Sequence, residues 1–376
     1  MDKAEEIADS SITLLKNNNS LPINNSNAKR ILVTGPNAHN HTTLGDWHFE
    51  QPEENVVTIF EGIQQVGENY NHKVDYYDSG IKIRNIQDSK IKATAEMSTN
   101  YDHVFVVVGD NSLRYSWEGG KSFQKTAGEN KARSFLGLPG KQLDLVKSIY
   151  EKNKNLTVIY VSGKPISEPW IEDNIKSIIH AWEPGSMGGK SLGKIVFGEI
   201  NPSGKMPMTT ARSVGQLTMV YNHKPTNYIH KYAFEKTKPL YPFGHGLSYT
   251  TFSISDPKLS KSKWNGKGSL EVETVVTNTG NMAGAETIQL YIRDKFSSVT
   301  RPVLELKAYN KITLHPGESK IVSFSLTAES FAYYNIGMEY LAENGDFIIY
   351  TGSSSAFKNL KKASLNLTQN IYFNEE

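Results

Sequence analysis

The first half of the chain alternates short apolar runs with segments of helical periodicity. The apolar runs predict buried strands at residues 31–36, 73–77, 103–108, 156–161 and 177–182. Between them, apolar residues recur at helical spacing near residues 57–64, 143–150 and 192–197. Strands that are apolar throughout and alternate with amphipathic helices are typical of a parallel sheet covered on both faces. We therefore predict an α/β sandwich over residues 1–222, with a mostly parallel sheet and helices on both faces.

The N-terminal segment predicts a helix over Met1–Lys16. Its apolar and small residues fall on one helical face, namely Ala4, Ile7, Ala8, Ser11, Leu14 and Leu15. A polar, turn-rich stretch follows over residues 17–27 and indicates a loop. The helix is thus expected to precede the first buried strand.

The periodicity changes near residue 222. Residues 223–252 contain several Pro and Gly residues and no clear period, which predicts a linker. Beyond it, apolar and polar residues alternate with a period of two, for example in Leu270–Thr277 and Lys320–Leu326. Short alternating strands separated by turn signals predict an all-β sandwich over residues 253–376.

Composition and charge exclude several classes of function. The 376 residues carry a net charge of +2 and contain no Cys, so neither a nucleic-acid surface nor thiol chemistry is expected. No apolar run approaches the roughly 18 residues of a membrane span. The sequence contains no P-loop and no dinucleotide-binding glycine motif after a strand. We accordingly expect no nucleic-acid partner, no membrane and no cofactor.

Two weaker patterns resemble functional sites. His39, His41 and His48 cluster after the first strand, but they lack a zinc-binding spacing, so loop histidines and no metal are expected. The Pro184–Gly188 segment resembles a nucleophile elbow, but Pro184 stands where the first glycine is needed. Glycines that let a helix start close to the sheet are the simpler interpretation.

Residues 109–142 form a long segment after the predicted central strand at residues 103–108. The segment contains Glu118 and Glu129, each beside a glycine, together with Tyr115 and Trp117. Long loops at the carboxyl ends of strands are often functional, and flat aromatic side chains suit the faces of sugar rings. A glutamate among aromatic and glycine neighbours can act as a general acid. The alternative is that both glutamates are solvated loop residues.

Several motifs carry a resemblance to a known family. They are TAGENKARSFLGLPGKQ, IADSSITLLKNNNSLPI, ILVTGPNA, LGDWHFEQPEENVVTIFEGI, AWEPGSMGGKSLGKIVFGEINPSGKMPMT, YPFGHGLSYTTF, TNTGNMAGAETIQLYIRD and RPVLELKAYNKITLHPGE. Together they resemble the C-terminal region of glycoside hydrolase family 3, of the bacterial β-glucosidase type. The last two resemble the fibronectin type III-like domain of the family, so the all-β sandwich is expected to have that fold.

The resemblance assigns roles to particular residues. Glu129 falls on the acid/base of the family and Arg133 on the arginine of its pattern, while Asn130 and Ala132 replace its glycine and aspartate. Glu118 is therefore a competing candidate for the acid/base. The position of Leu138-Pro139-Gly140 after Glu129 favours Glu129. Tyr115, Trp117 and Arg133 are expected to bind substrate.

The resemblance also implies an N-terminal (β/α)8 barrel that carries the aspartate nucleophile, and this chain is expected to start after it. Gly45-Asp46-Trp47 resembles the nucleophile motif only by accident, so Asp46 is not expected to be the nucleophile. The implied function is the C-terminal part of a retaining, exo-acting β-glycosidase that hydrolyses terminal β-linked sugars. Its partners would be an oligosaccharide or β-glucoside substrate and the barrel, in cis or in trans.

The alternative is a non-catalytic module that binds a glycan or the barrel. The chain would then supply an interface in place of a sugar subsite. The sequence does not fix the localisation; a periplasmic or secreted parent enzyme would agree with the resemblance.

Overall fold

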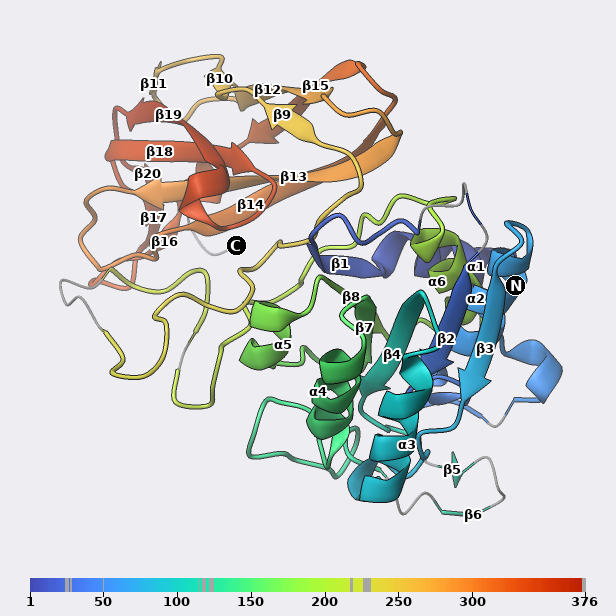
Figure 1. Ribbon diagram of the computed structural model, residues 1–376. Helices are drawn as coiled ribbons and strands as arrows, with labels where there is room; N and C mark the ends of the chain where they lie inside the picture. Colours follow the sequence, from blue (N-terminus) through green and yellow to red (C-terminus); the bar gives the residue numbers. More distant parts are fainter. Residues whose placement is uncertain are drawn as a thin grey trace. The chain divides into compact units, whose positions relative to one another are not determined.

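The chain divides into two compact units. The computed structural model describes residues 1–23, 27, 29–49, 51–113, 115–116, 120–121, 125–216, 219–225 and 231–373, with the main chain alone at 115–116 and 120–121. The first unit comprises Met1–Lys205, Thr210–Gln216 and Gly246–Tyr249, and the second comprises Met206–Thr209, Leu217–His245 and Thr250–Glu376. Figure 1 shows helices and strands in the first unit and mainly strands in the second.

The first unit is built on a six-stranded sheet with the order β1-β8-β7-β4-β2-β3. Its strands are β1 (Thr13–Asn17), β2 (Arg30–Thr34), β3 (Lys73–Tyr77), β4 (His103–Gly109), β7 (Leu156–Val161) and β8 (Ser177–Trp182). Neighbouring strands are parallel except β1, which pairs with β8 in the antiparallel sense. This arrangement confirms the predicted α/β sandwich with a mostly parallel sheet.

Six α-helices are described in the first unit. They are α1 (Asp2–Ser11), α2 (Ile59–Glu68), α3 (Asp88–Ser98), α4 (Gln142–Lys152), α5 (Pro169–Asn174) and α6 (Gly188–Val196). Helix α2 begins with a capping box, in which Thr58 and Glu61 satisfy each other's backbone amides. Short 3-10 turns occur at Thr42–Leu44, Glu53–Asn55 and Ile83–Asn85, and the short strands β5 (Tyr115–Ser116) and β6 (Gly120–Lys121) pair in the antiparallel sense.

Both faces of the sheet are apolar, which explains the unbroken apolar runs in the sequence. In β4, Phe105 and Val107 belong to one core cluster together with Ile63 of α2 and Leu192 of α6. Side chains alternate between faces along a strand, so Val106 points to the opposite side, where it is also fully buried. A strand that is buried on both faces cannot show a polar alternation.

Glycines allow α2 and α6 to pack in direct backbone contact. A Cβ atom on Gly62 would lie 1.9 Å from the carbonyl oxygen of Gly189, and one on Gly193 would lie 2.2 Å from that of Gly62. Within the Pro184–Gly188 segment itself, a Cβ atom on Gly188 would meet only Pro184, and one on Gly185 would meet nothing within 4 Å. The close helix contact is made by glycines outside this segment, and the interpretation that its glycines bring a helix close to the sheet stays a prediction.

The predicted N-terminal helix is wrong beyond Ser11. Helix α1 ends at Ser11, and Leu14 pairs with Ile179 of β8 as part of strand β1. Leu14 and Leu15 are buried there, whereas Ile7 on the predicted apolar face is 67% exposed. Pairing satisfies backbone groups along the edge of β8, and this tertiary gain outweighs the local helical pattern.

The strand order reverses beside β2, because β3 lies on one side of it and β4 on the other. In open parallel sheets, such a reversal leaves a crevice at the carboxyl ends of the two central strands. Here the loops after β2 and β4 meet: the side chain of Asn37 donates to the carbonyl of Asp110 at 2.7 Å. The fold thus brings residues that are far apart in sequence to one edge of the sheet.

The second unit is an all-β sandwich, as predicted. Its strands are β9 (Phe252–Ile254), β10 (Lys258–Leu259), β11 (Lys263–Trp264), β12 (Leu270–Asn278), β13 (Gly284–Asp294), β14 (Glu305–Leu314), β15 (Ser319–Leu326), β16 (Tyr333–Tyr334), β17 (Tyr340–Ala342), β18 (Gly345–Gly352), β19 (Leu360–Leu367) and β20 (Ile371–Tyr372), with 3-10 turns at Ala328–Phe331 and Phe357–Asn359. The main sheets have the orders β10-β12-β15, with β9 paired to β12, and β11-β19-β18-β13-β14. Trp264, Phe331 and Phe347 occupy their shared core.

Phe243 of the predicted linker and Tyr221, which lies just before it, pack on this sandwich. Tyr221 and Phe243 cover Tyr291, Leu304 and Tyr350, and the rings of Tyr221 and Phe243 stack with centroids 4.6 Å apart. The described residues between 223 and 251 contain no helix or strand. The domain limits at residues 222 and 253 stay a prediction.

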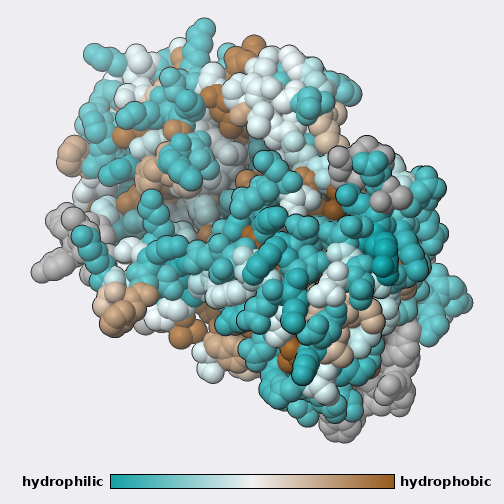
Figure 2. Space-filling view, viewed as in Figure 1, coloured by the Kyte–Doolittle hydropathy of each residue, from teal (hydrophilic) through white to brown (hydrophobic). Residues whose placement is uncertain are grey.

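The surface of the chain is mainly polar on the face that Figure 2 shows, where apolar atoms form small, separate patches. Within the described ranges, no helix has both the length and the apolar character that a membrane crossing needs.

A fragment of residues 253–376 should unfold cooperatively on its own, since its two sheets enclose their own core. A fragment of residues 217–376 should be more stable by about 1–3 kcal/mol, because it also covers the ring of Tyr291. Urea unfolding followed by fluorescence would measure both free energies. The prediction fails if the shorter fragment shows no cooperative transition or if the two fragments are equally stable.

Candidate active site

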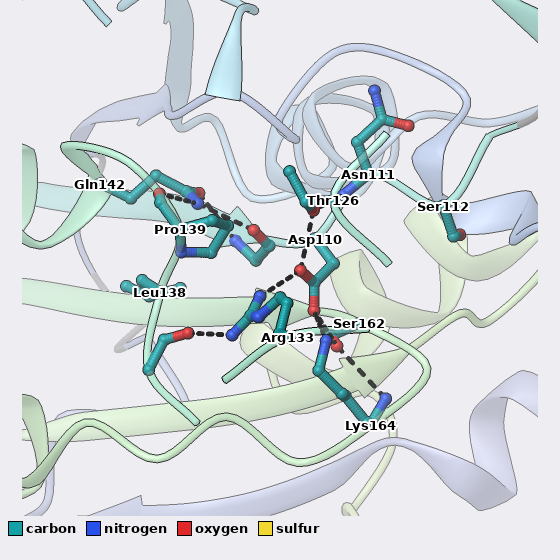
Figure 3. Close-up of polar contacts among 12 residues, drawn as sticks. Asp110, Asn111, Ser112, Thr126, Arg133, Leu138, Pro139, Gln142, Ser162 and Lys164 are labelled. Carbon is teal, nitrogen blue, oxygen red and sulfur yellow. Dashed lines mark hydrogen bonds and ion pairs between the residues drawn. The ribbon is translucent and has the colours of Figure 1, made fainter. Parts of the chain in front are cut away.

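Asp110 stands directly after β4, at the start of the long segment that the sequence singled out. It is only 2% exposed. Oδ1 accepts hydrogen bonds from Thr126 Oγ1 at 2.8 Å and from Arg133 Nη1, and Oδ2 accepts from Ser162 Oγ at 2.8 Å and from Lys164 Nζ. Figure 3 shows these donors converging on the carboxylate. Asp110 therefore ties the long segment to the end of β7.

The environment of Asp110 favours its ionised form. Burial alone would raise the pKa of Asp110, but the Lys164 ammonium, the Arg133 guanidinium and the Ser162 hydroxyl hold it below the usual value. A carboxylate whose ionised form is favoured at this position is a strong anchor for the two cations.

Arg133 was predicted to bind substrate. Its side chain is 8% exposed and pairs with Asp110. Its other terminal nitrogen donates to the carbonyl of Gly137, and its guanidinium lies 4.4 Å from the centroid of the Phe135 ring. Arg133 thus stabilises the fold of the segment itself, while a contact between Arg133 and substrate stays a prediction.

The segment is closed at its base by two further sets of hydrogen bonds. Gln142, the first residue of α4, accepts from the amide of Gly109 at 2.9 Å and donates to its carbonyl at 2.8 Å (Figure 3). The amide of Thr126 donates to the carbonyl of Asn111 at 2.7 Å, and the amide of Asn111 donates to Thr126 Oγ1 at 3.0 Å. Residues 127–133 consequently project from a fixed base.

Glu129, the predicted acid/base, lies on an exposed turn of this projecting part. The amide of Lys131 donates to the carbonyl of Gly128 at 3.1 Å and closes the turn. Asn130 has a φ of 60°, in the left-handed region that glycine and asparagine adopt most easily. This conformation explains why asparagine can stand where the family pattern has a glycine.

The loop after β2 contributes a second carboxylate, Asp46. Its Oδ2 accepts a hydrogen bond from the amide of Glu129 at 2.6 Å. Its Oδ1 forms an ion pair with Lys125 Nζ at 2.8 Å, and the two side chains are 10% and 11% exposed, respectively. Asp46 is therefore in direct contact with the main chain of the predicted acid/base.

Glu183, immediately after β8, is a third carboxylate at this edge of the sheet. It accepts a hydrogen bond from Ser112 Oγ at 2.5 Å. Burial raises the pKa of Glu183; the Ser112 hydrogen bond opposes this effect, and the nearby charges of Asp110 and Asp46 add to it. A carboxyl group with a raised pKa at a strand end is itself a candidate for proton transfer.

Some predicted site residues cannot be placed. Glu118 and Trp117 lie outside the described residues, as does the side chain of Tyr115, whose main chain belongs to β5. The role of Glu118 as competing acid/base and the sugar-binding roles of Tyr115 and Trp117 stay predictions.

The histidines after β2 have separate surroundings. His39 Nδ1 is 2.9 Å from Thr58 Oγ1, and His48 Nδ1 is 2.8 Å from the carbonyl oxygen of Gly45. Within the part of the chain that the structure describes, no group of three or more His, Asp or Glu side chains could hold a metal ion.

The segment that resembles a nucleophile elbow forms a turn after β8. The carbonyl of Ser186 in this turn accepts a hydrogen bond from the amide of Val57.

The roles of Asp46, Asp110 and Glu183 were not predicted from the sequence. Asp110 directly follows β4 and Glu183 directly follows β8, and a polar residue at the end of a buried strand is a usable signal for a site at the edge of the sheet. Asp46 carries no such signal, because a loop and a 3-10 turn separate it from β2.

Replacing Glu183 by Gln should stabilise the chain more at pH 8 than at pH 4.5. The raised pKa means that the fold favours the protonated carboxyl of Glu183. The wild-type chain therefore loses stability as the pH rises through the folded-state pKa of Glu183, whereas the variant does not. Glutamine mimics the protonated form and still accepts from Ser112. Urea unfolding at both pH values would measure the difference, with Glu54→Gln at an exposed position as control. A constant difference between the two pH values would contradict the prediction.

Comparisons with known proteins agree with this architecture. Residues 12–249 match the glycosyl hydrolase family 3 C-terminal domain, and residues 286–355 match the fibronectin type III-like domain. A β-xylosidase of Formosa agariphila is 36% identical, over 96% of this chain and 49% of the relative. The periplasmic β-glucosidase of Salmonella typhimurium is 34% identical, over 94% of this chain and 48% of the relative.

Solved structures give the same result. The β-glucosidase of Listeria innocua in complex with isofagomine has a TM-score of 0.87 at 28% identity, over 98% of this chain and 50% of that one. A β-glucosidase of Erythrobacter marinus has a TM-score of 0.84 at 31% identity, over 97% of this chain and 50% of that one. The chain thus spans about half the length of these relatives. It belongs to glycoside hydrolase family 3, of which it carries the C-terminal α/β domain and the fibronectin type III-like domain.

Proposed function

We propose that this chain is the C-terminal part of a retaining, exo-acting β-glycosidase and that Glu129 is its acid/base. The observation that carries the proposal is the position of Glu129. It is exposed on a turn whose base is fixed at the carboxyl end of the central strand β4, within a chain that belongs to a glycosidase family. An exposed carboxyl group on an anchored turn can reach a sugar bound outside this unit.

The proposed reaction uses two carboxyl groups, one as nucleophile and one as acid/base. An aspartate of an N-terminal (β/α)8 barrel, in cis or in trans, attacks the anomeric carbon, while Glu129 protonates the oxygen of the leaving group. Water then hydrolyses the glycosyl-enzyme after Glu129 removes its proton. Retention of configuration requires the two carboxyl groups to stand about 5–5.5 Å apart. The role of this chain is to hold the proton donor at that distance.

The substrate class follows from the relatives. They include a β-xylosidase and a β-glucosidase, so we propose a terminal β-linked xylose or glucose as the sugar that is released. Tyr115 and Trp117 would supply apolar surfaces for sugar rings, and Arg133 a polar contact with substrate. The described contacts of Arg133 with Asp110 and Gly137 support at least a role in shaping the segment.

Both the sequence and the structure support Glu129 over Glu118 as the acid/base. The motif Leu138-Pro139-Gly140 follows Glu129 as in the family pattern, and the amide of Leu138 is fixed by Glu168 at 2.7 Å. Asn130 in the left-handed conformation can replace the glycine of that pattern. The register that assigns Glu129 to the acid/base is therefore compatible with the backbone.

The 376-residue chain by itself should hydrolyse aryl β-glucosides and β-xylosides at a negligible rate. The proposed nucleophile belongs to the barrel, and losing a covalent nucleophile removes the step that divides a difficult displacement into two easier ones. Release of nitrophenol by highly purified chain would measure the activity. Robust turnover, with a glycosyl group trapped on a carboxylate of this chain, would contradict the proposal.

Replacing Glu129 by Gln in the chain joined to a family 3 barrel should lower kcat on a poor leaving group by about 10²–10⁴-fold. An activated aryl leaving group needs little protonation, so its glycosylation step should be affected much less. Deglycosylation should still be slow, because the same carboxylate activates water. Azide needs no general base and should restore turnover on the activated substrate.

Glu118→Gln is the matched control for this experiment and should show neither the leaving-group dependence nor the azide rescue. If Glu118→Gln shows both effects while Glu129→Gln stays near wild type, Glu118 is the acid/base. If neither variant shows them, the proton donor lies elsewhere, and a non-catalytic role for this chain gains support.

A further inference from the structure

Asp46 places a nearly buried carboxylate against the main chain of Glu129. The hydrogen bond from the Glu129 amide to Asp46 Oδ2 measures 2.6 Å, and the two residues are 83 positions apart in the sequence. The Asp46 side chain is 10% exposed. An amide that donates to a carboxylate forms a charge-assisted hydrogen bond, which is about twice as strong as a neutral one. This contact fixes the Cα atom of Glu129 relative to the loop after β2.

The neighbouring residues are arranged around this contact. Gly128 has a φ of +89°, and a Cβ atom at this position would lie 2.6 Å from Asp46 Oδ2. The absence of a side chain therefore lets the turn approach the carboxylate. Lys125 pairs with the other oxygen of Asp46 at 2.8 Å and neutralises the charge. Both ends of residues 125–129 are thus held by one side chain.

The Asp110 anchor does not replace this contact. Asp110 holds Thr126 and Arg133, on either side of the turn. Asp46 binds the residue between them that carries the functional carboxyl group. A turn that is held only at its two ends could rotate about the line that joins them, whereas a third contact at its centre removes this freedom.

We infer that Asp46 is a positioning residue for the acid/base: it fixes the main chain of Glu129 and so sets the direction in which the Glu129 side chain leaves the turn. This inference rests on the proposed role of Glu129. Misplacing a catalytic group by about 1 Å can cost roughly 10²-fold in rate, so such a contact has a measurable effect on turnover. Asp46 acts through Glu129 and needs no contact with substrate.

The first test uses the chain itself, labelled with ¹⁵N-glutamate. The amide signal of Glu129 is identified by its loss in the Glu129→Gln variant. In Asp46→Ala, hydrogen exchange of this amide should accelerate at least tenfold, and in Asp46→Asn, which keeps one acceptor oxygen, it should accelerate less. Asp88→Asn removes an exposed ion pair with Lys141 and should leave the exchange rate unchanged. An unchanged rate in a folded Asp46→Ala variant would overturn the inference.

The second test measures catalysis by the same variants joined to a family 3 barrel. Asp46→Ala should lower kcat on a poor leaving group by about 10²-fold with little change in KM, and Asp46→Asn by less. The loss in kcat/KM, which reports the glycosylation step, should shrink with an activated leaving group, as in Glu129→Gln, since both changes weaken proton donation. A role in stability alone would lower the melting temperature without this dependence on the leaving group.

The outcomes separate this inference from the proposed function. If Glu129→Gln shows the leaving-group dependence and Asp46→Ala does not, Glu129 is the acid/base and the inference about Asp46 is wrong. If Glu129→Gln stays near wild type, the proposed function fails first and the inference fails with it. Leaving-group dependence in both, with faster amide exchange in Asp46→Ala, supports both.

Discussion

The carboxylate of Asp110 is the constraint on which the geometry of this site depends. A charge buried at the end of a central strand is tolerated only when it is paired and hydrogen-bonded. Asp110 meets this requirement with donors from two segments, the 126–133 turn region and the residues after β7. Removing one partner of such a group typically costs about 3–5 kcal/mol, so the segment after β4 has to fold back onto its own base.

The three carboxylates at this edge of the sheet differ because their neighbours differ. Asp110 is surrounded by cations and its pKa is lowered, whereas Glu183 has a hydroxyl donor and negatively charged neighbours, and its pKa is raised. Asp46 pairs with one lysine and one backbone amide. The charged carboxylate of Asp110 therefore serves as scaffold, and the group proposed to exchange protons with substrate lies on the exposed turn.

The architecture of the first unit could be predicted because both faces of its sheet are covered. Val106 and Val107 point to opposite faces and are both fully buried, so burial itself appears in the sequence as an unbroken apolar run. The same logic failed at Leu14 and Leu15, whose spacing suits a helix. They form a strand because they pair with the edge of β8, which lies far away in the sequence. The local pattern of apolar residues contains no information about that edge.

The candidate site was predictable only where it follows a strand end or a family motif. Glu129 was reached through the Leu-Pro-Gly motif that follows it, and Arg133 through its place in the same pattern. The contacts that hold them, from Asp46 and Asp110, join residues distant in sequence and are made partly to backbone amides, which carry no residue identity. In the sequence, such a contact can be recognised only from the residue types whose size or conformation allows it.

Gly128 and Asn130 are the residues that allow the contact between Asp46 and Glu129. Gly128 leaves space for the Asp46 carboxylate, and Asn130 adopts the left-handed conformation that turns the chain back. Substituting glycine for Asn130 would preserve the turn, whereas a β-branched residue there would oppose it. A side chain at Gly128 would instead displace Asp46 while leaving Glu129 chemically intact. The residues on either side of the proposed acid/base thus determine where its carboxyl group is held, although neither can transfer a proton.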